Sequence, residues 1–276
     1  VGLEEKINTI LATRKAKFKP TNESIINFCD VIGDYNKGHR DDEYAKNRFG
    51  LKKRIVPGTQ LAALGEQYIA GVVEIINGKF DSEIIQTGMG IKFREPIHPG
   101  ESIRWQVTDY SEKDGVTLDI GGARDHVIVI PITATLGRKY CEPAEVTGRH
   151  VSQKSFDIDA DKLKLFYESI GEEPENMIPW SYTTSFVTSA LLEISAGEDG
   201  DPSGINRGMS FSFVKLPETR PIQVDIFLAR DPKQYRRHPG LEGKWGYKFS
   251  AICSQNGSPL AYGTIDVLAD KELHLN

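Results

Sequence analysis

Three side chains that could bind and move protons stand close together in the sequence: Asp34, Asn36 and His39. A carboxylate and an imidazole five residues apart on a folded-back loop can share one water molecule, which suits general acid–base chemistry. The amide of Asn36 would fix the loop or orient the imidazole. The alternative is a solvated polar loop in which Asp34 and Asn36 only cap turns. Residue types alone favour this alternative, because such loops are common.

Helices are predicted on both sides of these residues. Apolar residues recur at helical spacing in 3–11 and in 20–32, where Thr21 or Asn22 would cap the second helix. Residues 33–53 are polar and irregular, with a short helical turn expected near 43–48. From Pro57 to Gly78 apolar residues lie on nearly every side, which predicts a long, buried helix.

After Gly78 the apolar period changes from helical to alternating. Alternation predicts strands in 91–94, 103–107, 116–120 and 127–136, with Gly121-Gly122 as a turn or bulge between the last two. The first half therefore reads as a long helix followed by an antiparallel sheet. Residues 141–154 are predicted to be a connector.

The second half repeats this order of elements. Residues 17–33 align with 155–171 at an offset of 138, and residues 55–57 align with 177–179 at an offset of 122. Met89 and Phe93 then match Met209 and Phe213 at an offset of 120. Three blocks in the same order favour an internal duplication over chance similarity.

The change of offset means that the second copy lacks 16 residues. They fall where the first copy carries Asp34 to Arg54, so the candidate chemistry is confined to the first copy. In the second copy, Glu172 takes the place of Asp34 and no histidine follows it before the long helix. Trp180 stands where the first copy has Gly58. One active site per chain is therefore expected, with spare room against the second long helix near Ser185.

The loop resembles the signature G-D-x-N-P-x-H-x-D-P-x-x-A of the MaoC-like, (R)-specific enoyl-CoA hydratases. The matching residues are Gly33, Asp34, Asn36, His39, Asp41 and Ala45. Both prolines of the signature are replaced, by Lys37 and Asp42. Further similarity lies in Ile55-Val56-Pro57-Gly58 and in the aromatic strand and Pro-Gly turn of 93–101.

This resemblance implies a double hot-dog fold of class α+β, in which each of two tandem units wraps an antiparallel sheet around a long helix. The units are predicted at 1–140 and 155–276, joined by the connector. The resemblance also implies reversible hydration of trans-2-enoyl thioesters to (R)-3-hydroxyacyl thioesters, a hydro-lyase reaction of fatty acid metabolism that needs no cofactor or metal. Asp34, His39 and Asn36 would form the catalytic loop, and the N–H of Gly58 would polarise the thioester carbonyl.

The basic run Lys52-Lys53-Arg54 directly precedes the long helix. It would meet the phosphates of acyl-CoA or of an acyl carrier protein thioester, with Pro57 beside the substrate, or else it is simply solvated. The sequence leaves open the carrier, the chain length, the direction of the reaction, and which of Asp34 and His39 is the base. A homodimer of double units is compatible with this prediction.

Charge and composition exclude several other classes. The 276 residues carry 34 Lys and Arg against 39 Asp and Glu, a net charge of −5, which disfavours a nucleic-acid binder. No apolar run has the length of a membrane span, the N-terminal residues lack a signal-peptide core, and the three cysteines fit a reducing compartment. A cytoplasmic location is therefore expected.

Two alternatives to the hydratase remain at this point. A hot-dog thioesterase would use a carboxylate on the long helix, for which Glu66 is the candidate. A non-catalytic partner subunit of a dehydratase would bind acyl chains only, but it would have no need of Asp34 and His39 together.

Overall fold

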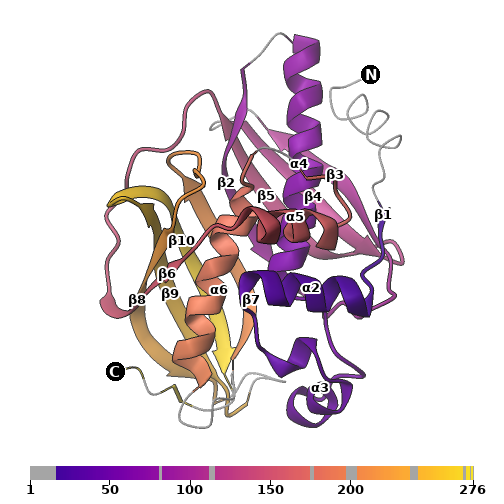
Figure 1. The fold of residues 1–276 in the computed structure, drawn as a ribbon. Helices are drawn as coiled ribbons and strands as arrows, with labels where there is room; N and C mark the ends of the chain where they lie inside the picture. Colours follow the sequence, from indigo (N-terminus) through magenta and orange to yellow (C-terminus); the bar gives the residue numbers. More distant parts are fainter. Residues whose placement is uncertain are drawn as a thin grey trace.

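The computed structural model (Figure 1) describes residues 17–80, 83–111, 116–174, 177–196, 204–236, 242–269, 272–273 and 275. The helix predicted for 3–11 lies outside the described residues. The N-terminal half runs in chain order through β1 (Lys17–Phe18), α2 (Asn22–Ile32), the 3-10 turn η1 (Lys37–His39), α3 (Asp42–Phe49), α4 (Gly58–Phe80), β2 (Ile85–Lys92), β3 (Ile103–Ser111), β4 (Val116–Arg124) and β5 (Val127–Gly137). The C-terminal half runs through β6 (Arg149–Phe156), α5 (Ala160–Ser169), α6 (Trp180–Ala196), β7 (Gly204–Phe213), β8 (Ile222–Gln234), β9 (Trp245–Gln255) and β10 (Ser258–Ala269).

All ten of these strands form one antiparallel sheet, in the order β1-β3-β4-β5-β2-β7-β10-β9-β8-β6. The second five strands repeat the order of the first five from the opposite edge, so the internal duplication is visible in the topology. The two halves join where β2 pairs with β7, and at the centre of this seam Gly90 lies opposite Ser210, its own equivalent at the offset of 120. A pseudo-twofold axis therefore passes through the seam.

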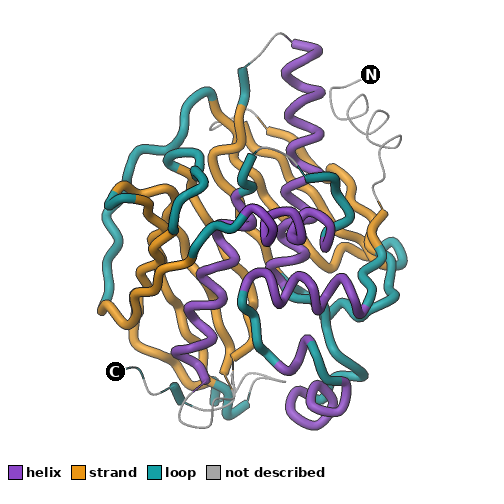
Figure 2. The backbone as a smooth tube through the Cα atoms, in the orientation of Figure 1, coloured by secondary structure: helices purple, strands orange, loops and turns teal. Residues whose placement is uncertain are grey.

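The helices lie on one face of this sheet (Figure 2). The long helices α4 and α6 each pack on the strands of their own half and also contact each other. Helices α2 and α5 pack together across the axis, where the rings of the equivalent residues Phe28 and Phe166 have centroids 5.3 Å apart. The result is the expected double hot-dog fold of class α+β, with one continuous core shared by the two halves. None of the helices in the described part of the chain could cross a membrane.

Local signals predicted the start and end of α2 correctly. The Thr21 hydroxyl accepts from the Ser24 N–H at 3.0 Å, and Ser24 in turn caps the Thr21 N–H. Gly33 ends the helix in the left-handed region with φ of 72°, where a side chain would be strained. This turn sends the chain directly into the loop that carries Asp34.

Four sequence predictions need correction. The strand predicted at 91–94 is β2, which runs from Ile85 to Lys92. Gly121 and Gly122 lie inside β4 at a bulge, so the option of a turn there is wrong, and the turn falls at Asp125-His126, both with positive φ. A Cβ at Gly122 would lie 3.0 Å from the Trp105 ring. The predicted connector ends early, since its last residues begin β6, which pairs with β8. Helix α4 continues past Gly78 to Phe80.

Candidate active site

The loop after α2 is held by its own polar groups. The Asp34 N–H closes the end of α2 by donating to the Cys29 carbonyl at 2.8 Å, and the carboxylate Oδ1 of Asp34 accepts from the Asn36 N–H at 3.0 Å. Asn36 Oδ1 accepts from the Gly38 N–H at 2.9 Å and thereby begins η1. The Arg40 guanidinium donates to the Asp34 carbonyl oxygen from outside. Asn36 therefore fixes the loop, and Oδ2 of Asp34 has no protein donor among the described residues.

His39 is oriented by the residues that lead into α4. Its Nδ1 lies 2.9 Å from the carbonyl oxygen of Ile55, which can only accept, so Nδ1 carries a proton and donates. In the neutral ring Nε2 is then the unprotonated nitrogen, and it lies 3.6 Å from Asp34 Oδ2. That separation is longer than a direct hydrogen bond and leaves both atoms available to a third group.

Asp34, Asn36 and His39 are 1%, 7% and 9% exposed, which rules out the alternative of a solvated polar loop. They face a cavity of about 330 Å³ between the two halves of the chain. The N-terminal half contributes Gly58, Thr59 and Phe93, among others, and the C-terminal half contributes Thr188, Leu192 and residues 204–207. Apolar walls with a few convergent polar groups are typical of a small-molecule site.

Helix α4 begins at this cavity with Gly58. A Cβ at that position would lie 2.7 Å from the Phe93 ring, so only glycine allows the ring to cover the helix start. The first N–H groups of a helix have no partner within the helix, and among the described residues no acceptor contacts those of Gly58 and Thr59. These N–H groups and the helix dipole can therefore meet a partly negative oxygen in the cavity.

Helix α6, the equivalent of α4, begins quite differently. The N–H groups of Trp180 and Ser181 donate to the two carboxylate oxygens of Glu66, at 2.8 and 2.6 Å. Burial raises the pKa of Glu66, while the hydrogen bonds from Ser181 and Trp180 oppose that shift. The Trp180 ring stacks on the Phe213 ring, with the two ring centroids 4.2 Å apart. The second helix start is closed, and Glu66, the thioesterase candidate, is the group that closes it.

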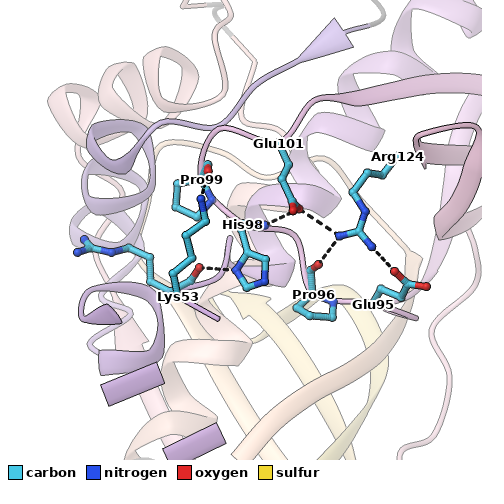
Figure 3. Close-up of polar contacts among 8 residues, drawn as sticks. Lys53, Glu95, Pro96, His98, Pro99, Glu101 and Arg124 are labelled. Carbon is cyan, nitrogen blue, oxygen red and sulfur yellow. Dashed lines mark hydrogen bonds and ion pairs between the residues drawn. The ribbon is translucent and has the colours of Figure 1, made fainter. Parts of the chain in front are cut away.

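The basic run before α4 has protein partners. The Lys53 ammonium donates to the Pro99 carbonyl at 2.7 Å, and Arg54 pairs with Asp42 at 2.7 Å. Figure 3 shows the surrounding network, in which His98 Nδ1 donates to the Arg54 carbonyl and Glu101 binds the His98 N–H and Arg124. Lys52 is exposed, and neither the run nor Pro57 lines the cavity beside Asp34.

The cavity-lining residues that the sequence analysis did not assign to the site include Thr59, Arg94, Thr188 and Arg207. Arg94 and Arg207 are exposed at its rim, on adjacent strand ends where the Phe93 N–H donates to the Arg207 carbonyl. Arg94 could have been noticed because it follows the landmark Phe93, and Thr188 because it is the equivalent of Glu66 at the offset of 122.

The room predicted near Ser185 lies elsewhere. The hydroxyl of Ser185 donates to the Tyr182 carbonyl within a fully buried helix face, and Phe186 there stacks on Phe156. The cavity instead reaches α6 at Thr188 and Leu192, and both residues also border a smaller apolar cavity of about 40 Å³ that extends to Phe249 and Ile265. Among the described residues, no cluster of His, Cys, Asp or Glu could hold a metal ion.

Known proteins resemble this chain both in a family model and in fold. Residues 12–125 match the family model of the FAS1-like dehydratase domain region. Among solved structures, a putative MaoC domain protein dehydratase from Chloroflexus aurantiacus has a TM-score of 0.65 at 10% identity, over 93% of each chain. A conserved hypothetical protein of Mycobacterium tuberculosis with a double hotdog fold has a TM-score of 0.62 at 6% identity, over 91% of this chain and 93% of that one.

A putative oleoyl thioesterase from Lactobacillus plantarum is also similar, with a TM-score of 0.51 at 8% identity, over 94% of this chain and 96% of that one. Curated proteins give no match to the sequence. The solved structures show the fold, and the family model covers the half that carries the motif. Together they support the resemblance drawn from the motif: the chain has the double hot-dog fold, and most of its N-terminal half matches a dehydratase family model.

Proposed function

We propose that the protein catalyses the reversible hydration of trans-2-enoyl thioesters to (R)-3-hydroxyacyl thioesters, at one site per chain. The observation that carries this proposal is the pair formed by Asp34 Oδ2 and His39 Nε2, buried in a cavity and 3.6 Å apart. One water molecule can bridge two such atoms, because each of them can accept one of its hydrogen bonds.

In this proposal the bridging water adds to C3 of the substrate. The Nδ1 proton of His39 is committed to the Ile55 carbonyl, so Nε2 starts as an acceptor. The proton that reaches C2 is then supplied by the water itself, through the Asp34 and His39 pair, and hydroxide and proton arrive from the same side. The charge that develops on the thioester oxygen meets the free N–H groups at the start of α4.

A CoA or acyl carrier protein thioester is the substrate class, with the acyl chain running between the halves toward Thr188 and Leu192. Arg94 and Arg207 at the rim are the cations placed to meet phosphate oxygens. Phosphate binding by Lys52, Lys53 and Arg54 stays a prediction, as do the contact of Pro57 with substrate, the cytoplasmic location and the homodimer. Glu66 does not support hydrolysis, since its carboxylate is held by the start of α6.

The test uses crotonyl-CoA and a longer trans-2-enoyl-CoA with the full chain. Hydration removes the absorbance of the conjugated enoyl thioester without releasing thiol, and the product should react only with an (R)-specific 3-hydroxyacyl-CoA dehydrogenase. Thiol release measured with a disulfide reagent would instead indicate a thioesterase. Loss of absorbance with an (S) product would contradict the stereochemistry, and binding without turnover would indicate a partner subunit.

A further inference from the structure

The hydroxyl group of Thr59 is buried at the cavity without a partner. Thr59 is 3% exposed, its Oγ1 makes no hydrogen bond, and the residue lines the cavity together with Asp34, His39 and Gly58. A threonine in a helix interior commonly donates to the carbonyl four residues earlier, but Thr59 is the second residue of α4 and residue 55 lies before the helix. Buried hydroxyls are nearly always bonded, so this one is left for a group that enters the cavity.

The start of α6 shows what such a set of donors binds. Ser181 is the equivalent of Thr59 at the offset of 122, as Trp180 is of Gly58. The N–H groups of Trp180 and Ser181 bind the Glu66 carboxylate, and the Ser181 hydroxyl faces the same carboxylate without reaching hydrogen-bond geometry. The two copies therefore share a design in which the first two residues of the long helix surround an oxygen-bearing group.

In the first copy the place of Glu66 is left to a ligand. The residue equivalent to Glu66 is Thr188, whose short side chain lines the cavity. The corresponding donors at α4 are two N–H groups and one hydroxyl, and among the described residues none of them has a protein acceptor.

The geometry assigns a further substrate-binding group: the Thr59 hydroxyl donates a hydrogen bond to the thioester carbonyl oxygen, beside the N–H groups of Gly58 and Thr59. This inference rests on the proposed hydration. As water adds to C3, the electron pair of the C2–C3 double bond moves toward the carbonyl and negative charge gathers on its oxygen. The hydroxyl shares its proton with that oxygen without transferring it. When C2 takes up its proton, the carbonyl is restored and the hydrogen bond weakens.

Two matched variants, Thr59→Val and Thr59→Ser, test this role with crotonyl-CoA. Valine keeps the shape of threonine without the hydroxyl, and serine keeps the hydroxyl. Removing one donor to a developing oxyanion typically lowers kcat by about 100-fold, so Thr59→Val should lose on the order of 100-fold in kcat. Thr59→Ser should retain most of the wild-type kcat. A Thr59→Val enzyme as fast as wild type would overturn the inference.

Thermal unfolding separates this role from a structural one. A hydroxyl without a partner in the free protein adds nothing to its stability, so Thr59→Val should unfold at the same temperature as wild type or higher. A lower melting temperature together with lost activity would overturn the inference.

If wild type fails to hydrate any enoyl thioester, the proposed function fails, and binding of the saturated analogue butyryl-CoA still tests Thr59. Weaker binding by Thr59→Val than by Thr59→Ser would support the hydrogen bond to the carbonyl. Equal affinities, or no binding by wild type, would overturn it.

Discussion

The two long helices of this protein occupy equivalent places but begin in opposite states. At α4 the first residue is Gly58, the ring of Phe93 covers it, and its N–H faces a cavity of about 330 Å³. At α6 the first residue is Trp180, its own ring stacks on Phe213, and its N–H is bound by Glu66. Phe93 and Phe213 are equivalent residues. Phe93 covers the open start of α4, whereas Phe213 helps to close the start of α6.

The difference depends on the residue that reaches across from the opposite helix. Glu66 on α4 is long enough to bind the start of α6, whereas its equivalent on α6, Thr188, stops short of the start of α4. A helix start binds whichever oxygen is available, because its first N–H groups have no partner within the helix. We therefore infer that the side chain reaching across from the opposite helix helps to decide whether a helix start is capped within the chain or left open to the cavity.

The largest expected effect comes from removing the proton-transfer groups that only the first copy has. Asp34→Asn and His39→Gln should each lower the hydration rate by about 100-fold or more, the scale of positioned proton transfer. The fold should persist, because both residues lie on a loop and the changes conserve size. Steady-state assays with crotonyl-CoA, with circular dichroism on the same samples, check both points.

The matched control is Glu172→Gln, the same change at the position that replaces Asp34 in the second copy. It should leave the rate unchanged. A rate loss in this variant, or two bound ligands per chain in a titration with a non-turnover analogue, would contradict the single site.

The next effect should come from making the two helix starts alike. Thr188→Glu would offer a carboxylate to the N–H groups of Gly58 and Thr59, as Glu66 does at α6. Loss of the oxyanion donors should lower kcat by about 100-fold. Thr188→Val, which has the same size and no carboxylate, should remain active. If both variants keep wild-type rates, the side chain at 188 does not control access to α4.

A smaller effect should follow from giving the rim of the cavity in the first copy the residue that the second copy has. Arg94 is the equivalent of Val214 at the offset of 120, so Arg94→Val gives the first copy the residue of the second. Losing one charge-assisted hydrogen bond to phosphate should raise KM for a CoA thioester by about tenfold at low salt, with kcat nearly unchanged. Lys52→Gln serves as the comparison. A larger effect of Lys52 than of Arg94 would assign the phosphates to the basic run instead.

The smallest effect on activity is expected at Glu66. Glu66→Gln should keep the hydration rate but lower the free energy of unfolding by about 1–3 kcal/mol, because one buried N–H loses a charged acceptor. The pKa of Glu66 is raised in the folded protein, so the folded state holds this proton more tightly than the unfolded state does. Wild type should therefore lose stability relative to Glu66→Gln as pH rises from about 4.5, the ordinary value, to the raised value, and level off above it.

Urea unfolding of both proteins across that pH range measures the difference. A difference that stays flat with pH would contradict the raised pKa. Loss of hydration in Glu66→Gln, with the fold intact, would give this carboxylate a part in the chemistry after all.

Patterns that are local in the sequence predicted most of the fold. The cap at Thr21, the end of α2 at Gly33 and the switch from helical to alternating spacing after α4 all depend on neighbouring residues, and the structure has each of them. The bulge at Gly121-Gly122 is confirmed, but the alternative of a turn there is wrong, because these glycines continue β4 and Gly122 lies against the Trp105 ring of the adjacent strand. The strand start at Arg149 failed for a similar reason, since its partner β8 lies more than 60 residues away.

The candidate site also has a part that local sequence patterns predicted and a part that depends on contacts between distant residues. Asp34, Asn36 and His39 lie within one short motif, and the structure brings them to one cavity. The closure of α6 joins Glu66 to residues 114 and 115 positions away, and the cavity beside Thr59 is lined by residues from both halves of the chain. Contacts between such distant residues are not visible in residue types and spacing alone.

The β2–β7 seam holds inside one chain an association that separate units would have to make by meeting in solution. Two identical subunits carry every substitution twice, so a glutamate at the position of Glu66 would close both helix starts of a symmetric dimer, and a threonine there would leave both open. Covalent linkage removes this constraint. It also makes the pairing independent of protein concentration, because the two halves are never diluted apart. The fused chain can therefore use one helix start for stability and keep the other for a ligand.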